Sequence, residues 1–387
     1  MRKLSGWAPP IAALCALAIV SHLPSALAAK IIYPGSFALT GTMATPRFAH
    51  TATLLNDGTV LVTGGADNNG VTQFNAEIYN PATGTFALAH GVMDVARVLH
   101  TATLLNDGTV LIAGGEAFSG AEVYATADIY NPATGLFTLT TTTMTTARAE
   151  HTATLLPNGD VLIAGGFDTT GNPVATAELY NPATQTFTAT GNMSIERLGH
   201  SATLLQSGEV LIAGGQAKSG AVLKTAEVYD PATAIFTLTA KKMKVARTLH
   251  TATLLNNGEV LLASGFGVHG TTTRSATLYN PATNEFLAAR EVIHSGYFAT
   301  ATLLPTGDLL RSGGFDVPFA TPALSRANSE AYVIATGKFE SGPVMAFARE
   351  DHTATLLPNG TVLVIGGASV TTGGKVTIQA TAEIFTP

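Results

Sequence analysis

The sequence predicts an all-β fold, a seven-bladed β-propeller with four-stranded antiparallel blades. The main observation is a segment, HTATLLNDGTVLVTGG from His50, that returns nearly unchanged at His100, His151, His200, His250 and His352. A weaker copy begins at Ala299, and successive copies are 50, 51, 49, 50, 49 and 53 residues apart. A fixed period near 50 residues is typical of propellers with one four-stranded sheet per repeat.

Alternation and turn chemistry divide each repeat into four strands. HTATLL forms the first strand, and VLVTGG, which is apolar throughout, forms a second strand that is buried on both faces. The Asn-Asp-Gly sequence between them has residues that tolerate positive φ in a hairpin turn. A variable loop leads to a third strand ending at Tyr79, and the turn at residues 80–83 leads to a fourth strand that contains Phe86.

The two ends of the repeat region predict how the ring closes. The last copy stops after its third strand, at Phe385, so the seventh blade has no fourth strand of its own. Residues 33–39 match the missing piece, with Phe37 in the place of Phe86. We therefore expect the N-terminal strand to complete the C-terminal blade, which removes two open sheet edges.

The repeats resemble those of the kelch family of β-propellers. The resemblance rests on a double glycine that ends the second strand in six copies and on an aromatic residue in every third strand. The Trp that the family usually has in the fourth strand is replaced by Phe, as at Phe86 and Phe137. The resemblance implies that residues 29–387 form a single propeller domain.

The first 28 residues are typical of an export signal. Arg2 and Lys3 precede an apolar run at residues 11–20, and Ala26-Leu27-Ala28 has the small-residue pattern of a signal-peptidase site. The apolar run is shorter than the about 20 residues that a membrane-spanning helix needs. We predict cleavage after Ala28 and release to the periplasm or the outside of the cell, without a membrane span.

Composition and charge argue against several classes of partner and cofactor. With 20 Lys and Arg against 26 Asp and Glu, the net charge of -6 lacks the basic footprint of a nucleic-acid-binding protein. The single cysteine, Cys15, excludes a disulfide framework and a thiolate metal cluster. We therefore expect no nucleic acid, no metal and no other cofactor, and a monomeric protein.

Six copies have Arg-x-x-His before the first strand, and six have an acid in the third strand. Residues repeated once per blade are spread around a circle, so we interpret them as blade packing rather than catalysis. They are Arg47, His50, Glu77, Arg97, His100, Asp128, Arg148, His151, Glu178, Arg197, His200, Glu227, Arg247, His250, Glu330, Arg349, His352 and Glu383. Thr277 replaces one acid, and Gly296 replaces the next Arg along the chain. This joint loss predicts that each acid pairs with the Arg entering the next blade.

Functional residues are expected where the repeats differ. Antiparallel strands place the loops after the double glycines and the linkers before the His positions on one face, the loop face, and the short turns on the opposite turn face. The loops contain aromatic, acidic and amide side chains that suit a sugar or a peptide, and they are equally consistent with loops that pack on one another. The candidates are Phe118, Tyr124, Phe167, Asp168, Gln216, Lys218, Phe266, His269, Arg311, Phe315, Asp316 and Phe319.

Two functions from different classes stay open on the sequence. The first is a binding or scaffold module that recognises an unknown protein or glycan on the loop face. The second is a metal-free carbohydrate-active enzyme such as a sugar mutarotase, with acid and base groups from Asp168, His269, Arg311 and Asp316. The resemblance also implies copper radical oxidases, but their Cys–Tyr crosslink is excluded if Cys15 is removed with the export signal.

Overall fold

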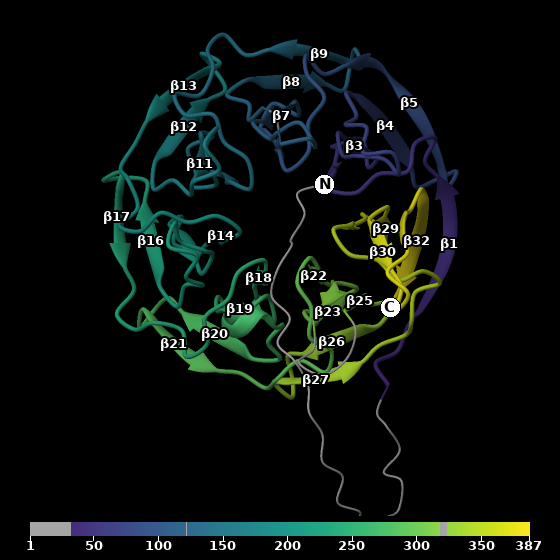
Figure 1. The fold of residues 1–387 in the computed structure, drawn as a ribbon, viewed down its shortest axis with the longest axis vertical. Coiled ribbons are helices and arrows are strands. Elements are labelled where there is room, and N and C mark those ends of the chain that lie inside the picture. Colours follow the sequence, from purple (N-terminus) through teal and green to yellow (C-terminus); the bar gives the residue numbers. More distant parts are fainter. Residues whose placement is uncertain (1–31, 121, 318–322) are drawn as a thin grey trace, which may run out of the picture.

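The computed structural model describes residues 32–120, 122–317 and 323–387. Seven four-stranded antiparallel sheets form a closed ring around a central axis, as Figure 1 shows. The only helix in these ranges is a short 3-10 turn, η1 (Val268–Gly270), and none of their helices is long and apolar enough to cross a membrane. The predicted all-β propeller with seven blades is confirmed. The predicted export signal at residues 1–28 lies outside the described residues and stays a prediction.

Each blade runs from an inner strand beside the axis to an outer strand at the rim. Blade 1 consists of β2 (Thr51–Leu54), β3 (Val60–Thr63), β4 (Asn75–Asn80) and β5 (Thr85–Val92). Blade 2 consists of β6 (Thr101–Leu104), β7 (Val110–Ala113), β8 (Ala127–Asn131) and β9 (Leu136–Leu139). Blade 3 consists of β10 (Thr152–Leu155), β11 (Val161–Ala164), β12 (Ala177–Asn181) and β13 (Thr186–Ala189).

The remaining blades repeat this order. Blade 4 consists of β14 (Ser201–Leu204), β15 (Val210–Ala213), β16 (Ala226–Asp230) and β17 (Ile235–Leu238). Blade 5 consists of β18 (Thr251–Leu254), β19 (Val260–Ala263), β20 (Ala276–Asn280) and β21 (Glu285–Ala288). Blade 6 consists of β22 (Thr300–Leu303), β23 (Leu309–Ser312), β26 (Ser329–Val333) and β27 (Lys338–Ser341). Blade 7 consists of β28 (Thr353–Leu356), β29 (Val362–Ile365), β32 (Thr381–Thr386) and the N-terminal β1 (Ser36–Thr42).

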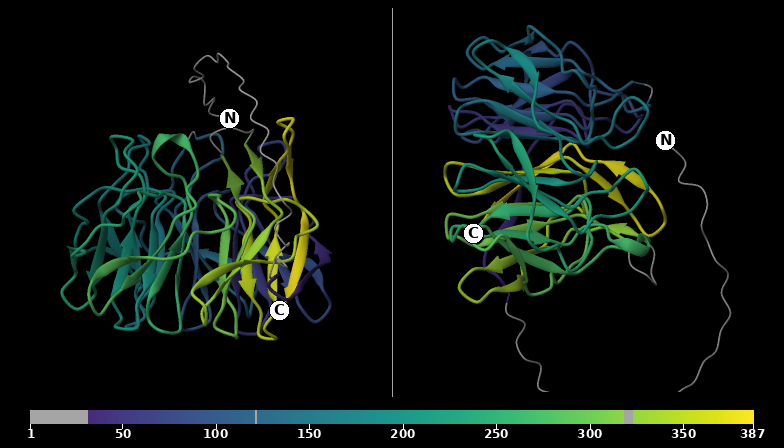
Figure 2. Two further views of the ribbon diagram at one scale, coloured as in Figure 1. Left: turned by 90° about the horizontal axis from the view of Figure 1, so that it is seen from below. Right: turned by 90° about the vertical axis from the view of Figure 1, so that its left-hand side faces the viewer.

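Two of the variable loops form additional hairpins on the loop face. One consists of β24 (Phe315–Asp316) and β25 (Leu324–Ser325), and the other consists of β30 (Ala368–Val370) and β31 (Val376–Ile378). The side view on the left of Figure 2 shows the yellow hairpin of blade 7 rising above the ring. The loop face therefore has projecting hairpins, whereas the opposite turn face has only short turns between strands.

The ring closes through the predicted exchange of strands. β1 pairs with β32 in antiparallel register, with Phe37 opposite Phe385. Their rings lie 5.1 Å apart, as the Tyr and Phe rings of the other blades do at similar distances. The N-terminal strand thus gives the last blade its outer strand and leaves the ring without an open junction.

The hydrophobic core lies between neighbouring blades. One cluster joins Leu111 and Ile129 of blade 2 with Val161 and Tyr180 of blade 3, and Met144 of the connecting linker fills the space between them. All the second strands are buried along their whole length, which explains their apolar sequence. Because each cluster is shared by two sheets, a single blade cannot bury its own faces.

A buried arginine anchors six of the seven linkers to the blades that they enter. The Arg148 guanidinium donates hydrogen bonds to the Gly165 carbonyl oxygen at 2.9 Å and to the Glu178 carboxylate at 2.9 Å. The backbone carbonyl of such an arginine accepts a hydrogen bond from the preceding blade, as Arg148 does from Gly115 at 2.9 Å. One residue therefore connects two blades. Its side chain binds the blade that the linker enters, and its backbone carbonyl binds the blade that the linker leaves.

The predicted partners of these arginines are wrong by one blade. Arg148 pairs with Glu178 of the blade that it enters, and Asp128, the expected partner, pairs with Arg97 at 2.8 Å. Arg47 likewise pairs with Glu77 of the blade that it enters. The pairs Arg197–Glu227 and Arg349–Glu383 follow the same rule. The interpretation of these residues as structural is unaffected, because both members of each pair are buried.

The acid lost at Thr277 and the arginine lost at Gly296 belong to two different ion pairs, one in blade 5 and one in blade 6. Arg247 is buried without an acid, and its guanidinium is held by Ser264 and Ser275 instead. Burial without an opposing charge lowers its pKa to about 10. Glu330 has lost its repeat arginine at Gly296, and Arg311 from β23 replaces it with a 2.9 Å ion pair.

The first glycine of the double glycine shows how tightly the blades pack. At Gly64, with φ of +64°, an added Cβ atom would lie 2.4 Å from the Arg97 carbonyl oxygen and 2.5 Å from the His100 ring. The corresponding residue in blade 5 is Ser264, and the His position that faces it has become Ala299. The Ser264 hydroxyl uses the released space and accepts a hydrogen bond from the Gly296 amide at 2.9 Å.

We expect Arg148→Ala and Glu178→Ala each to lower the free energy of unfolding by about 3 to 5 kcal/mol, because each leaves a buried charge without its partner. The double variant should lose less than the sum of the two, by about 0.5 to 3 kcal/mol, in a double-mutant cycle measured by chemical denaturation. The pair Arg148→Ala and Asp128→Ala is the control and should be additive. If only the control pair were non-additive, Arg148 would pair with Asp128, as the sequence suggested.

We expect deletion of residues 36–42 to abolish cooperative thermal unfolding, because blade 7 then loses its outer strand. Leu39→Ala is the matched control, since this side chain is 58% exposed on the same strand and should change the free energy of unfolding by less than about 0.5 kcal/mol. Differential scanning calorimetry measures both. An unchanged melting temperature after the deletion would contradict closure by β1.

Candidate functional site

A ring of seven residues surrounds the axis where each linker turns into an inner strand. The members of this axial ring are Ala49, Leu99, Glu150, Gly199, Leu249, Phe298 and Asp351, and each has a φ between 50° and 60°. Backbone hydrogen bonds run from member to member; for example, the Glu150 amide donates to Leu99 at 3.1 Å and the Leu99 amide donates to Ala49 at 3.4 Å. These bonds support a left-handed conformation that costs non-glycine residues free energy.

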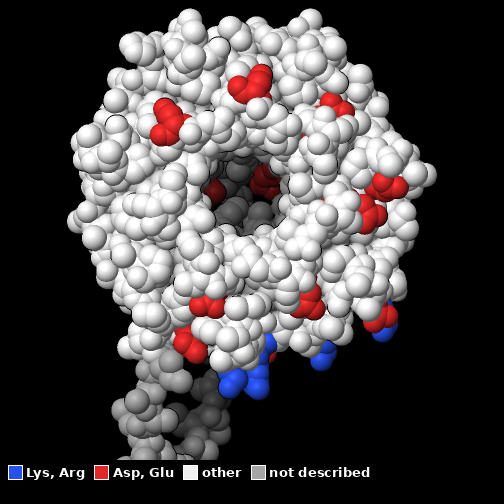
Figure 3. Space-filling model, turned by 180° about the vertical axis from the view of Figure 1, so that it is seen from behind, with Lys and Arg blue, Asp and Glu red and all other residues white. Residues whose placement is uncertain are grey.

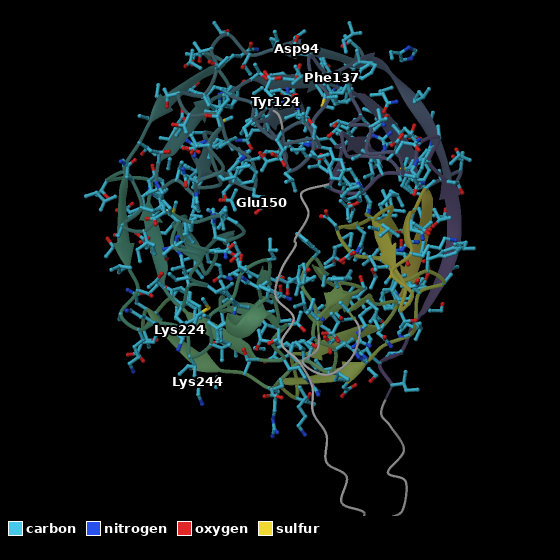
Figure 4. The ribbon with its side chains drawn as sticks, in the orientation of Figure 1. Asp94, Tyr124, Phe137, Glu150, Lys224 and Lys244 are labelled. Atoms are coloured by element: carbon cyan, nitrogen blue, oxygen red, sulfur yellow. The ribbon has the colours of Figure 1, made fainter. Side chains whose placement is uncertain are left out.

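The axial ring encloses a pocket of about 330 Å³ on the axis. Its wall consists of the axial ring and of the His residues that follow it in the sequence. Figure 3 shows the opening on the axis with acidic atoms in its depth, and Figure 4 shows Glu150 close to the centre of the ring. A volume of this size lies at the lower end of the range for small-molecule sites.

The six His residues in the wall have a packing function. Each Nε2 is hydrogen-bonded to a Thr or Ser hydroxyl of the preceding inner strand at 2.9–3.1 Å, as His100 is to Thr51. Burial, followed by the charge of the neighbouring arginine, lowers the pKa of His151 to about 3. The imidazoles are therefore neutral at pH 7 and connect inner strands, which agrees with the structural interpretation from the sequence.

Glu150 and Asp351 are the only ionisable members of the axial ring. Burial raises the pKa of Glu150 to about 7, and the charges of Asp351 and Glu116 add to this shift. Burial also raises the pKa of Asp351 to about 7. Beside it, burial and then the charge of Asp351 raise the pKa of Glu350 to about 8.

These acids give the pocket a chemistry that the rest of the ring does not have. Carboxyl groups with a pKa near 7 exchange protons at neutral pH, which is the property required of a general acid or base. In the neutral form they donate a hydrogen bond to a ligand oxygen, and in the ionised form they accept hydrogen bonds from hydroxyl or ammonium groups. The pocket can therefore bind a polar group or transfer a proton.

Phe298 lines the pocket on the blade 6 side, and Tyr297 connects it to a group of aromatic rings. Tyr297 lies between Phe266 and Phe315, with ring centroids 5.5 and 5.6 Å away, and Phe298 of the axial ring lies 4.9 Å from Tyr297. Phe266 and Phe315 were among the predicted ligand residues, and the structure brings these two together. Their neighbours Tyr297 and Phe298 occupy the two variable positions of the motif in the copy where Gly296 and Ala299 replace its Arg and His.

Three other predicted ligand residues, Arg311, Asp316 and Asp168, form ion pairs or hydrogen bonds with neighbouring protein groups. Arg311 is buried in its pair with Glu330, and Asp316 is buried in contact with Arg326, Thr272 and Ser295, so neither lies on the loop surface. Asp168 accepts hydrogen bonds from Thr170 and Asn172 of its own loop. Burial raises its pKa, but these hydrogen bonds outweigh that effect and leave the pKa lowered.

The remaining candidates lie on separate loops. Phe118 packs against Phe48 at 5.2 Å, and Tyr124 lies over the Arg97 guanidinium at 5.8 Å. Phe167 bridges to Ala149, Gln216 donates to Gly220 of its own loop, and the side chain of Lys218 is exposed. Phe319 and the side chain of His269 lie outside the described residues.

Glu150 and Asp351 are not among the functional residues predicted from the sequence. A signal was present, because they occupy the second variable position of Arg-x-x-His, where five copies have Ala, Leu, Gly or Phe. Their approach to one another depends on the ring closure, since they are 201 residues apart in the chain. The interpretation of the motif as blade packing concerned its Arg and His and left this position without a role.

We expect Glu150→Gln to change the pH dependence of stability. Because the pKa of Glu150 is raised in the folded state, its neutral form stabilises the fold at low pH, and this contribution is lost as pH rises from about 4.5 to about 7. The variant should match the natural protein near pH 4 and exceed its free energy of unfolding by about 1 to 2 kcal/mol at pH 8, allowing for solvent screening.

Chemical denaturation followed by circular dichroism measures this difference at both pH values. Asp107→Asn, at an exposed acid on the turn face, controls for the loss of one negative charge. An equal difference at pH 4 and pH 8 would mean that the pKa of Glu150 is not raised in the folded state.

Comparison with solved structures supports the fold and no more. A fungal alcohol oxidase of the AA5 family, solved in complex with copper, is similar with a TM-score of 0.71 and 17% sequence identity. The alignment covers 91% of this chain and 76% of that chain. A search of curated proteins finds no match to the sequence.

The residues of this chain do not suit a copper site with a Cys–Tyr crosslink. The chain has one cysteine, Cys15, which precedes the described residues. Within the described ranges no three His, Cys, Asp or Glu side chains are grouped so that they could hold a metal ion. The six ring imidazoles are instead hydrogen-bonded to separate inner strands.

The family follows from the repeat and the ring together. A sequence model of the kelch motif matches residues 150–194. These residues are one of seven in-phase copies, and the copies form seven equivalent blades. The kelch motif at residues 150–194 and the seven-bladed ring together support the kelch-repeat β-propeller family for this chain.

Proposed function

We propose that this protein is an exported binding module that recognises a protein or glycan across its loop face. A polar group of the ligand enters the axial pocket and binds Glu150 and Asp351. The observation that supports this proposal is the pair of carboxyl groups in an otherwise uncharged ring of equivalent residues. The kelch propeller fold is itself suited to binding and scaffolding, and the export signal predicted at residues 1–28 supports a site of action outside the cytoplasm.

The loop face supplies the larger contact area in this proposal. Phe298 lines the pocket and contacts Tyr297, and the partly exposed aromatic group of Phe266, Tyr297 and Phe315 offers apolar surface for a sugar ring or an apolar side chain. The carboxyl groups then determine specificity, because a ligand that fails to pair with them leaves polar groups buried without partners.

One observation favours a second function, a metal-free carbohydrate-active enzyme such as a sugar mutarotase. Two carboxyl groups with pKa values near 7 line one pocket, which is the arrangement that proton transfer to and from a hydroxyl group requires. Asp168, Arg311 and Asp316 are less suited to this chemistry, because they are engaged in their own loops or in ion pairs.

We expect the double variant Glu150→Gln, Asp351→Asn to lose at least tenfold in affinity for the ligand, because an amide cannot supply the carboxylate charge. A glycan array and a pull-down from the native envelope identify the ligand, and titration calorimetry measures the affinity. Asp107→Asn is the matched control, since it makes the same chemical change on the turn face. Far-ultraviolet circular dichroism checks that the variants are folded.

Two outcomes would contradict binding through the pocket. Unchanged affinity in the double variant, with loss in Phe167→Ala or Gln216→Ala, would place the site on the outer loops. Acceleration of sugar anomer exchange by the natural protein, abolished in the double variant, would establish the enzyme instead. Nuclear magnetic resonance measures that exchange directly.

A further inference from the structure

The exposed positive charge of the described residues is concentrated at one place. Seven arginines are buried inside the blades and contribute little to the surface: Arg47, Arg97, Arg148, Arg197, Arg247, Arg311 and Arg349. Ten Lys and Arg side chains are exposed or partly exposed: Lys218, Lys224, Lys241, Lys242, Lys244, Arg274, Arg290, Arg326, Lys338 and Lys375. Six of these ten belong to the outer edge of blades 4 and 5 and form what we call the basic rim: Lys224, Lys241, Lys242, Lys244, Arg274 and Arg290.

Backbone contacts between loops and linkers hold the basic rim together. The linker after β17 contacts blade 5 through a hydrogen bond from Ala240 to Asn284 at 3.1 Å, and Lys241 pairs with Glu285 at 2.9 Å. The same linker contacts Lys224 through the Met243 amide at 2.9 Å. In blade 5 the Arg274 side chain donates to the Val292 carbonyl oxygen at 3.1 Å, which places it on the linker that contains Arg290.

The figures show the same concentration. Lys and Arg atoms gather at one edge of the ring in Figure 3, while the rest of that face shows mainly acidic and uncharged residues. Figure 4 places Lys224 and Lys244 at the outer edge, beside the strands that Figure 1 labels β20 and β21. The acids beside the basic rim are Glu285 of β21, which is paired with Lys241, and Glu291 of the linker that follows β21.

Exposed aliphatic side chains lie on the outer strands beside these charges. Ile235 and Leu238 of β17 are 56% and 47% exposed, and Leu287 of β21 is 50% exposed. Leu287 lies two residues from Glu285, so both side chains point to the same face of the strand, and Glu285 contacts Lys241. Charge and apolar surface therefore occupy one area.

We propose that the basic rim docks on the surface of an anionic lipid bilayer. Lys and Arg side chains are attracted to anionic headgroups by about 1 kcal/mol each near the surface, and neighbouring aliphatic side chains enter the interface. The basic rim consists mainly of Lys on a convex edge, which suits a broad anionic surface. The outer strands beside it expose aliphatic side chains rather than the aromatic rings that single-stranded nucleic acids stack on.

The net charge of -6 gave the opposite expectation for polyanions. The net charge counts buried arginines together with exposed lysines and averages over the whole surface. The structure separates the two groups, because the repeat arginines are buried inside the blades, most of them paired with acids, whereas six of the ten exposed or partly exposed Lys and Arg side chains belong to the outer edge of blades 4 and 5. A locally basic surface thus exists on an acidic protein.

Vesicle sedimentation tests the proposal with the protein as purified after export, its N-terminus identified by mass spectrometry. We expect binding to vesicles of phosphatidylcholine and phosphatidylglycerol, weak binding to pure phosphatidylcholine, and loss of binding at high salt. Lys242→Glu with Lys244→Glu should reduce the partition coefficient at least tenfold. Leu238→Asn should reduce it several-fold.

Matched controls distinguish the basic rim from general charge and hydrophobicity. Lys338→Glu with Lys375→Glu makes the same charge change at exposed lysines elsewhere and should leave vesicle binding unchanged. Leu139→Asn makes the same change at the equivalent position of blade 2, where Leu139 is 51% exposed and no basic rim is present. Equal losses in the control variants, equal binding to neutral vesicles, or binding to a soluble anionic polysaccharide without binding to vesicles would overturn the proposal.

Discussion

The buried ion pair between linker arginine and third-strand acid is the interaction on which the ring depends. Removing two charges from water is costly, and the geometry repays that cost because each guanidinium also bonds a backbone carbonyl of its own blade. The carbonyl of the same arginine accepts a bond from the preceding blade. Each pair therefore fixes how the linker enters its blade and how that blade meets its neighbour.

This constraint determines the conformation at the axis. In six linkers the arginine is held in the blade and the His ring packs against a glycine of the preceding blade, so the residue between them turns sharply into the inner strand. Phe298 in the linker into blade 6 has the same positive φ, although Gly296 and Ala299 stand at the Arg and His positions. The positive φ of the axial ring and its chain of backbone hydrogen bonds follow from that turn. The side chain at this position is then free of blade packing, which explains why the sequence varies there and why two acids can occupy the pocket.

The repeat period was sufficient to predict the architecture from the sequence. Seven copies, a missing outer strand at the C-terminus and a spare strand at the N-terminus left one way to close the ring, and the pairing of Phe37 with Phe385 confirms it. The partner of each arginine was not determined in this way, because a repeat relates every Arg equally well to the acid before it and to the acid after it. Separate losses at Thr277 and Gly296, in adjacent blades, resembled the loss of one pair.

The same limit explains what the sequence could not show of the candidate site. Glu150 and Asp351 share a pocket only because closure brings blades 3 and 7 to one axis, and nothing in their local sequence records that approach. The two proposed surfaces are also compatible with one another in space. A protein attached to a bilayer by the outer edge of blades 4 and 5 stands with its axis parallel to the membrane. Its loop face and axial pocket then stay open to ligands in solution, so attachment and recognition do not compete for surface.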